Sequence, residues 1–426
     1  MFSTLRDAWK VKDLRKKMIY TLLMLAVFRL GNVISVPGID TSVLKDASSQ
    51  QGSLFGFYDL ISGGAFSSFS IFALGVIPYI NASIIMQLLT IAIPQLEQLS
   101  KEGEDGRKKI SQITRYLSIA LGLVQAFSQY FIIRSLGAIQ NDTGLTVFLI
   151  IVTLTAASTF LMWLGDRITM HGVGNGVSLL IFINIISRLP FTVRQLFTLE
   201  SGNSITIVSL VLFLAILIAM YIGVIIVSLA ERRIPVQYAG KTVGNKSFKG
   251  QSSHIPINIT SSSVIAIIFA MSVMQFPGTL AQFWPTSKFA IFINSNTFSP
   301  FNSNSWVYAL CYLLLIIFFT WFYTEITFKP DEMAENMHKS AGFIPGIRPG
   351  EHTARYIERI LGKIALLGGL FAGMIAIIPI LLSTYGNFKG VSFGGTSLLI
   401  MVGVALDTVR QIESQLVMRN YEGFLK

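Results

Sequence analysis

The sequence predicts an all-α polytopic membrane protein with ten transmembrane helices, and three observations lead to this fold class. The chain of 426 residues is 52% hydrophobic and 13% charged, with a mean hydropathy of +0.62. Its apolar residues form runs of about twenty along the whole length, and a helix needs about that many to cross a bilayer. The runs lack the strict alternation over about ten residues that is typical of barrel strands, so helices, which satisfy their own backbone hydrogen bonds, are favoured.

Ten apolar segments follow one another along the chain. The expected spans cover residues 18–36, 71–94, 113–134, 145–164, 172–190, 206–229, 262–281, 306–328, 360–382 and 393–412. The basic stretch from Arg6 to Lys17 leads into the first span without a small-residue cleavage site, so we expect that span to stay in the mature protein. Cys311 is the single cysteine and lies inside an apolar run, which is typical of a packed thiol.

The basic residues predict the orientation, because Lys and Arg are retained on the cytoplasmic side. Most of the 33 Lys and Arg residues fall in the N-terminal segment, in residues 101–115, 232–249 and 329–363, and in the tail. The alternate side holds Lys45, Arg134, Arg188, Arg194, Lys288 and Lys389. Both termini are therefore expected in the cytoplasm, and the net charge of +11 is mostly a topology signal.

Two cytoplasmic loops, residues 231–259 and 329–360, are longer than topology requires. In "GFIPGIRPGEHTARYIERI" two prolines and three glycines predict a rigid, exposed turn around Arg348. An arginine held in this way is suited to bidentate contact with carboxylate or phosphate. Ribosomal RNA and an acidic protein surface are both candidate partners, and a pair of solvated connectors is the alternative.

Five segments of the chain carry a family resemblance. They are "SIFALGVIPYINASIIMQLL", "KEGEDGRKKISQITRY", "FLMWLGDRITMHGVGNGVSLLIF", "FIPGIRPGEHTARYIERI" and "GGTSLLIMVGVALDTVRQIESQLVMRNYEGFLK". Together, and in this order, they resemble the SecY family, the central subunits of the bacterial protein-conducting channel. The resemblance implies two five-helix halves around a central pore, residues 1–190 and 206–412, with a hinge loop at 191–205, a short plug helix, a lateral opening toward lipid and a cytoplasmic tail at 413–426.

The resemblance also implies the function. The family translocates unfolded preproteins across the bacterial cytoplasmic membrane and releases membrane segments laterally into it. The implied partners are the SecE and SecG subunits, the SecA ATPase, the ribosome, preprotein signal sequences and membrane lipid. No catalytic activity, cofactor or metal is expected.

The stretch from about residue 53 to 70 resembles the plug of the family. It lies between the first two spans, Asp59 is its only charge, and it is too short to cross the bilayer. Small residues allow close approach to neighbouring helices. The residues assigned to the plug are Phe57, Ile61, Gly63, Gly64, Phe66 and Ser67. An ordinary re-entrant loop packed for stability is the alternative.

A narrow aliphatic ring holds ions back by dewetting, and the family places such a ring at the pore. By resemblance it falls on Val76, Ile80, Val177, Ile181, Ile268 and Ile400. Two of the pairs have the i, i+4 spacing that puts both members on one helix face, as a pore lining needs.

The resemblance implies a lateral gate between the second and third spans on one side and the seventh and eighth on the other. Polar groups there must pair across the seam or within the helices. The assigned residues are Asn81, Gln87, Gln125, Ser272, Gln275 and Phe276, and the residues assigned to SecA or ribosome binding are Arg232, Arg233, Lys241, Lys246, Lys249, Arg348 and Arg355. Interhelical hydrogen bonds without a moving part are the alternative for each gate residue.

A secondary solute transporter is the alternative function, because broken helices also mark solute sites at the membrane midplane. Transporters bury ionisable groups to couple ions, whereas here Arg29 lies mid-span and the other charges lie toward helix ends. An intramembrane enzyme is disfavoured because the chain has no HExxH motif and its expected spans contain no paired carboxylates, and "HGVGNG" has no following lysine for a phosphate loop. We expect those glycines to break the backbone between spans four and five.

Overall fold

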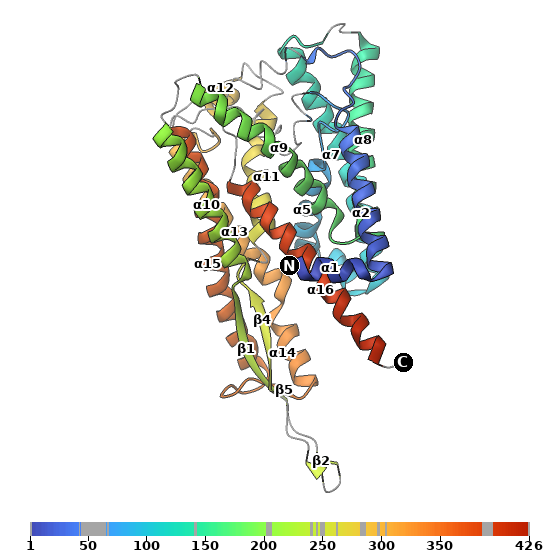
Figure 1. Cartoon of the computed structure of the whole chain (residues 1–426), viewed down its shortest axis with the longest axis vertical. Helices are drawn as coiled ribbons and strands as arrows, with labels where there is room; N and C mark the ends of the chain where they lie inside the picture. Colours follow the sequence, from blue (N-terminus) through green and yellow to red (C-terminus); the bar gives the residue numbers. More distant parts are fainter. Residues whose placement is uncertain are drawn as a thin grey trace.

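Long helices run side by side in the computed structural model of the chain, and a small β-sheet projects from one end of the bundle (Figure 1). The structure describes residues 2–41, 43, 65, 68–139, 143–201, 207–238, 242–243, 246–247, 252–260, 263–281, 287–295, 299–302, 305–385 and 395–424.

The helices of the N-terminal part pack mainly against one another. They are α1 (Phe2–Lys10), α2 (Lys12–Gly31), α5 (Ile77–Ala92), α6 (Pro94–Lys101), α7 (Glu104–Ser135), α8 (Gly144–His171) and α9 (Gly176–Ser201). Helix α5 packs on α7, α7 on α8, and α8 on both α2 and α9. In Figure 1, α2, α5, α7 and α8 lie on one side of the bundle, and α9 crosses from there toward α10.

The helices of the C-terminal part form the other side of the bundle. They are α10 (Ile207–Leu229), α11 (Ser263–Ala281), α12 (Lys288–Ser295), α13 (Trp306–Phe328), α14 (Pro330–Lys339), α15 (Glu351–Tyr385) and α16 (Gly395–Phe424). Helix α13 packs on α11 and α15, while α16 contacts α10 and α15 on its own side and α1 and α9 on the other. Helix α16 therefore joins the two groups.

The helical, polytopic fold class is confirmed. By length and composition, six helices of the described residues are able to cross a membrane, or seven if the bent pair α5 and α6 is one span. The expected spans at 172–190 and 262–281 contain shorter apolar helices, Gly176–Pro190 and Ser263–Gly278. The number of ten transmembrane helices stays a prediction.

Two glycine- and proline-containing breaks set the course of the chain. Helix α8 ends at His171 and α9 begins at Gly176, so the predicted break at the "HGVGNG" stretch is confirmed. Helices α5 and α6 meet at 100°. The backbone of Ile93 is extended at this bend, because Pro94 follows it and a residue before proline is disfavoured in the helical conformation.

Residues 191–201 differ from the expected loop. Helix α9 contains Pro190 and continues to Ser201, so most of the predicted hinge segment is helical. A proline ring removes one backbone hydrogen bond, but the stretch after it, "FTVRQLFTLES", contains no glycine that ends a helix.

The two long loops contain strands that the sequence analysis did not predict. Strands β1 (Glu231–Tyr238) and β4 (Ser252–Asn258) pair antiparallel, β5 (Gly342–Phe343) pairs with the other edge of β1, and β2 (Thr242–Val243) pairs with β3 (Lys246–Ser247). In β1, Ile234 and Val236 are buried and alternate with exposed residues, so one face of the strand packs on α14 and α15. The two loops thus form one folded unit.

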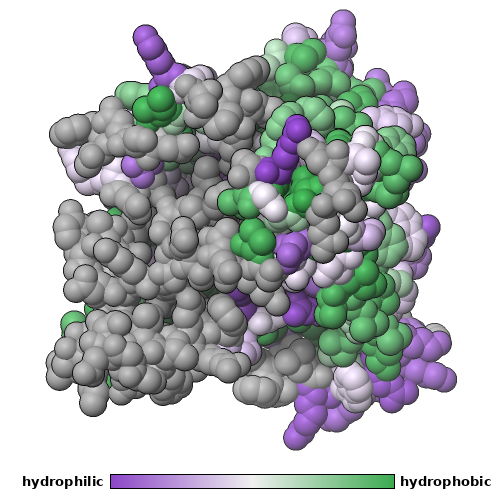
Figure 2. All heavy atoms as spheres, turned by 90° about the horizontal axis from the view of Figure 1, so that it is seen from above, coloured by the Kyte–Doolittle hydropathy of each residue, from purple (hydrophilic) through white to green (hydrophobic). Residues whose placement is uncertain are grey.

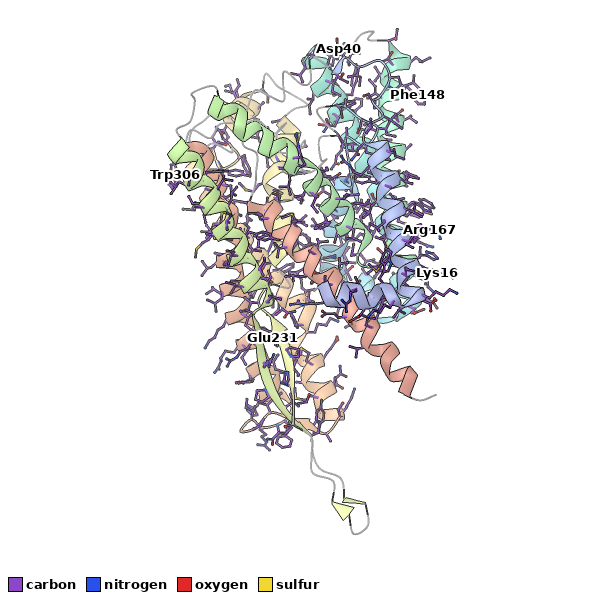
Figure 3. The ribbon with its side chains drawn as sticks, viewed as in Figure 1. Lys16, Asp40, Phe148, Arg167, Glu231 and Trp306 are labelled. Atoms are coloured by element: carbon purple, nitrogen blue, oxygen red, sulfur yellow. The ribbon has the colours of Figure 1, made fainter. Side chains whose placement is uncertain are left out.

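The outer surface is apolar along the helices and charged at the end of the bundle. Exposed leucines and isoleucines line α2, α10 and α13, among them Leu22, Ile218 and Leu314. In Figure 2, which looks at the bundle from above, hydrophobic residues are gathered mainly on the right-hand side. Lys16 and Arg167 lie at one end of the bundle and Asp40 at the other (Figure 3). Arg167 lies 5.4 Å from the Trp163 ring centroid. This distribution is typical of a membrane protein.

Candidate functional site

The six side chains assigned to the pore ring lie in one hydrophobic cluster, although they come from four helices. Val76 at the start of α5, Ile181 on α9 and Ile400 on α16 are buried in that cluster. The other three, Ile80, Val177 and Ile268, are partly buried and pack against it. Both halves of the bundle therefore contribute to the same apolar contact.

Close backbone packing fixes the start of α9, which carries two of these residues. A Cβ atom on Gly165 of α8 would lie 2.9 Å from the Val177 side chain, so only glycine allows α8 to approach α9 so closely. The Thr169 hydroxyl accepts a hydrogen bond of 2.9 Å from the Gly176 backbone N–H, and the Asn175 side chain accepts one of 3.2 Å from Ser178. These contacts set the direction in which Ile181 points.

A small cavity lies beside this cluster, between α5, α9, α11 and α16. The volume free to the centre of a water molecule is about 40 Å³, and the lining is mostly apolar. The lining residues are Ile77, Ile80, Asn81, Ile181, Ile185, Ile268, Met271, Ser272, Gln275, Thr396, Ser397 and Ile400. Four of the six ring residues and three of the six gate residues thus share one cavity.

The sequence analysis missed five lining residues: Ile77, Ile185, Met271, Thr396 and Ser397. Helical periodicity relates three of them to ring residues that the sequence analysis did assign. Ile185 follows Ile181 by four positions, Met271 follows Ile268 by three, and Thr396 precedes Ile400 by four, so each lies on the same helix face as its partner.

The gate residues divide into two groups. Asn81, Ser272 and Gln275 line the cavity. The Oδ1 atom of Asn81 is buried and has no hydrogen-bond partner among the residues that the structure describes. A buried carbonyl of this kind is destabilising until it meets a donor, so the Asn81 side of the cavity is suited to meet a hydrogen-bond donor.

The other three gate residues lie away from the cavity lining. Gln87 donates a hydrogen bond of 3.4 Å to Ser83 on its own helix, Gln125 is half-buried on α7, and the Phe276 side chain is exposed on the outer surface. Their assignment to a moving seam stays a prediction.

The six residues assigned to the plug lie outside the described residues. The end of that stretch is described and pairs with the chain that follows α2. Ser70 forms an antiparallel bridge with Ser35, and the Val36 N–H donates a hydrogen bond of 2.9 Å to the Phe69 carbonyl. The backbone is therefore fixed immediately before the second span.

Two of the basic residues assigned in the first loop lie on strand β1. Arg232 and Arg233 are exposed on β1, and Arg233 forms an ion pair of 2.6 Å with Glu231. Lys241 and Lys249 lie outside the described residues, while Lys246 belongs to β3.

The predicted turn around Arg348 is confirmed. Gly346 and Gly350 both have positive φ angles, of 81° and 97°, which glycine adopts readily. The Thr353 hydroxyl donates a hydrogen bond of 3.0 Å to the Arg348 carbonyl, and the arginine is exposed. Arg355 is also exposed but forms an ion pair of 2.6 Å with Glu351.

The described residues contain no group of three or more His, Cys, Asp or Glu that is arranged to hold a metal ion. The site is a mostly apolar cavity beside an aliphatic cluster, with a few polar groups in its wall.

Comparison with known proteins identifies relatives of the whole chain. The family model described as SecY matches residues 70–409. The chain is 42% identical to the protein translocase subunit SecY of Aquifex aeolicus and 42% identical to that of Bacillus subtilis, with all of both chains covered in each case. The corresponding subunit of Thermus thermophilus is 41% identical, with 100% of this chain and 98% of the relative covered.

Solved structures show the same fold at lower sequence identity. The structure described as a protein-conducting channel has a TM-score of 0.67 at 20% identity, with 95% of this chain and 93% of the other covered. The Sec61 chain of the canine ribosome–channel complex from the endoplasmic reticulum has a TM-score of 0.64 at 20% identity, with the same shares covered.

Proposed function

The chain belongs to the SecY family, and from this premise we propose that it is the channel subunit of a protein translocase. It carries unfolded preproteins across the cytoplasmic membrane and releases membrane segments sideways into lipid. The observation that carries the proposal is the aliphatic cluster to which both halves of the bundle contribute, with the cavity beside it.

The mechanism that we propose begins with the closed ring. Six aliphatic side chains exclude ions because water gains too little by wetting them. An incoming chain displaces them, and they close again around it because their contacts are non-directional and reform with any apolar surface. Val76, Ile80, Val177, Ile181, Ile268 and Ile400 are the proposed ring.

The lateral exit is proposed to open between α5 and α7 on one side and α11 and α13 on the other. Asn81, Ser272 and Gln275 lie in the wall of the cavity at this seam. The buried amide oxygen of Asn81 is more favourable when it is hydrated or bound to a translocating chain than when it is buried without a partner. A signal sequence that enters the seam supplies apolar surface to α5 and α11 and thereby stabilises the open state.

The cytoplasmic partners are proposed to bind the unit built from β1, β4, β5, α14 and α15. Arg348 projects from a turn that two positive-φ glycines and Thr353 hold, which makes it suited to a carboxylate or phosphate group. SecA and the ribosome are the proposed sources of driving force. SecE and SecG are the proposed membrane partners.

The proposed location is the bacterial cytoplasmic membrane, with both termini in the cytoplasm. The position of Lys16 and Arg167 at one end of the bundle, with Asp40 at the other, supports this orientation (Figure 3). The β1–β4 hairpin then lies in the cytoplasm with Arg232 and Arg348.

Reconstitution tests the function. The chain with its SecE and SecG partners is placed in vesicles, and SecA, ATP and a preprotein with a signal sequence are added. We expect ATP-dependent protection of the preprotein from external protease, and no protection without the signal sequence. Uptake of a small solute in the absence of SecA, without protein translocation, would instead favour the secondary transporter.

A further inference from the structure

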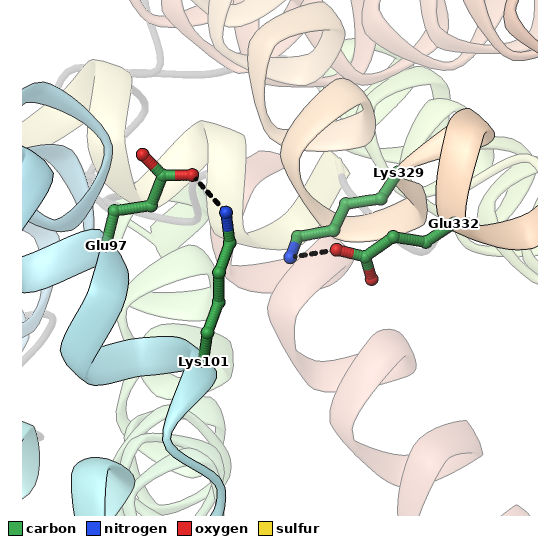
Figure 4. A network of polar contacts seen from close by, with 4 residues as sticks. All are labelled: Glu97, Lys101, Lys329 and Glu332. Atoms are coloured by element: carbon green, nitrogen blue, oxygen red, sulfur yellow. Dashed lines mark hydrogen bonds and ion pairs between the residues drawn. The ribbon is translucent and has the colours of Figure 1, made fainter.

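Two ion pairs lie next to each other where the two halves of the bundle meet at the cytoplasmic end. On α6 the Lys101 Nζ atom lies 2.7 Å from a Glu97 carboxylate oxygen, and near α14 the Lys329 Nζ atom lies 2.8 Å from Glu332. Figure 4 shows the two pairs facing each other, with both ammonium groups between the two carboxylates. Helix α6 follows the second span and α14 follows the eighth, so the four charges flank the proposed lateral gate.

The charges on the two helices interact across the seam. Lys101 lowers the pKa of Glu97, mainly through its hydrogen bond, and Lys329 on the other side lowers it further. Glu97 raises the pKa of Lys101, and Glu332 on the other side adds to the effect. Each member of the α6 pair therefore attracts the opposite charge near α14.

The backbone at Lys329 is a second observation. Lys329 ends α13 and precedes α14 with a φ of 40° and a ψ of 78°. This left-handed conformation is uncommon for a residue with a side chain, and glycine would adopt it with less strain. Pro330 follows directly and begins α14. The chain thus places a charged side chain at a sharp corner that faces α6.

We propose that these four residues form an electrostatic clasp that holds the cytoplasmic end of the seam closed. The ammonium groups exchange between the pairs seen in the structure and the cross-seam pairs Lys101–Glu332 and Glu97–Lys329. Exchange leaves every charge paired, so the clasp opens and closes without a charge being left unpaired. This inference rests on the lateral gate proposed above.

Two double variants isolate the interaction across the seam. In Lys101→Glu with Glu332→Lys, both charges on α6 are acidic and both near α14 are basic, so every interaction across the seam is attractive. In Lys101→Glu with Lys329→Glu, every interaction across the seam is repulsive. Both variants lose the pair within α6 and the pair near α14, so the loss of these local ion pairs is common to both.

The experiment measures the distance between spin labels at Gln98→Cys on α6 and Asn336→Cys on α14, with Cys311→Ser, in the reconstituted complex. Relative to the parent, we expect the wide-distance fraction to rise in the repulsive variant and to fall in the attractive one. In each variant the ratio of the wide-distance to the narrow-distance population should change about 1.5- to 5-fold, because the free energies of exposed ion pairs correspond to ratios of that size. A variant with all four charges changed to Gln should lie between the parent and the repulsive variant.

A high salt concentration gives an independent check, because the Debye screening length is only about 3 Å at 1 M ionic strength. The differences between variants should disappear there. The matched control exchanges the Glu335–Lys339 pair on α14, whose 2.8 Å contact lies within one helix, and it should leave the distance unchanged.

Equal distances in the attractive and repulsive variants would overturn the clasp, and so would an all-Gln variant as closed as the parent. Because the readout is a distance within the complex and needs no preprotein, it separates failure of the clasp from failure of the proposed transport function.

Discussion

At the residue scale, Ile400 is the sharpest test of the pore ring. It lines the cavity and is the member of the ring that α16 contributes. An unpaired amide costs about 1–3 kcal/mol when buried in a protein, and hydration of the pore removes this cost. We therefore expect Ile400→Asn to raise the open-to-closed ratio about five- to hundredfold. Single-channel recording of the resting ion leak in planar bilayers measures it.

The neighbouring Leu399 supplies the control. It is as buried as Ile400 but packs into a different cluster, with α11, α13 and α15 residues, because successive helical residues point about 100° apart. Leu399→Asn should lower stability and leave the leak unchanged. If both substitutions raise the leak equally, or neither does, Ile400 does not line the pore.

A second prediction at this scale concerns Arg348. A hydrogen bond to a charged group is worth about 1.5–3 kcal/mol, so Arg348→Glu should weaken SecA or ribosome binding about 10- to 100-fold without changing expression or folding. Arg355→Glu should have a smaller effect, because its guanidinium already pairs with Glu351. Affinity for SecA and for ribosomes is measured on the reconstituted complex. Full affinity after reversal at Arg348 would contradict the assignment.

At the element scale, apolar length predicted most of the helices. Each expected span overlaps a helix, because a run of about twenty apolar residues can satisfy its backbone hydrogen bonds within a bilayer by forming a helix. The β1–β4 hairpin was not predicted, since the alternation of Ile234 with Val236 and of Ile255 with Ile257 is short and lies among polar residues. The hairpin is stabilised by packing on α14 and α15, and a local sequence pattern cannot predict contacts with such distant segments.

The same limit applies to the site. Four of the ring residues and three gate residues lie at one cavity, and their identification depended on the family resemblance rather than on periodicity alone. Thr396 and Ser397 were missed because a polar pair at the start of an apolar helix is equally typical of a helix end. Only the approach of α5, α9 and α11 places them in the cavity wall.

The chain is anchored directly after the stretch assigned to the plug. The Ser35–Ser70 bridge and the Val36–Phe69 hydrogen bond fix the chain just after the assigned plug residues, so a deletion of residues 57–67 leaves this anchor in place. Loss of a displaceable element destabilises the closed state relative to the open one. We expect a resting ion leak several-fold above that of the parent, with preprotein translocation retained.

Single-channel recording of the plug deletion measures the leak, and protease protection measures translocation. A deletion of residues 282–292 has the same length and serves as the control, because it removes residues on the same expected side of the membrane, among them the first residues of α12. A pore as tight as the parent after deletion of 57–67 would mean that this stretch is only a structural loop.

At the scale of the whole molecule, most contacts between helices lie within one or the other group of helices. One cluster joins α10, α11, α13, α15 and α16 and includes Ile84 of α5. A second joins α7 and α8 to the segments before α5, and a third joins α2, α8 and α9 to Ile400 and Val404 of α16. Contact between the groups passes through α16 and α9 and through the ring residues. The groups can therefore separate with limited loss of core packing, which is the movement that a lateral exit requires.

The last prediction follows from the size of the passage between these groups. The resting cavity has about 40 Å³ free to a water centre, whereas a helix with its side chains is about 10–12 Å wide and a folded 100-residue domain has a radius of gyration of about 13 Å. A modest separation of the groups admits an extended chain or one helix. A domain requires that the ring and both groups of helices come apart completely.

A preprotein that ends in a small ligand-binding domain tests this limit. With the ligand present the domain stays folded, and we expect translocation to stop with the domain exposed to protease on the SecA side while the preceding segment is protected. Removal of the ligand lowers the domain's stability by mass action and should restore full protection with the same SecA and ATP. A domain variant that cannot bind the ligand should pass under both conditions. Complete protection of the ligand-bound, folded domain would show that the passage opens far beyond a single chain and that the ring does not set its width.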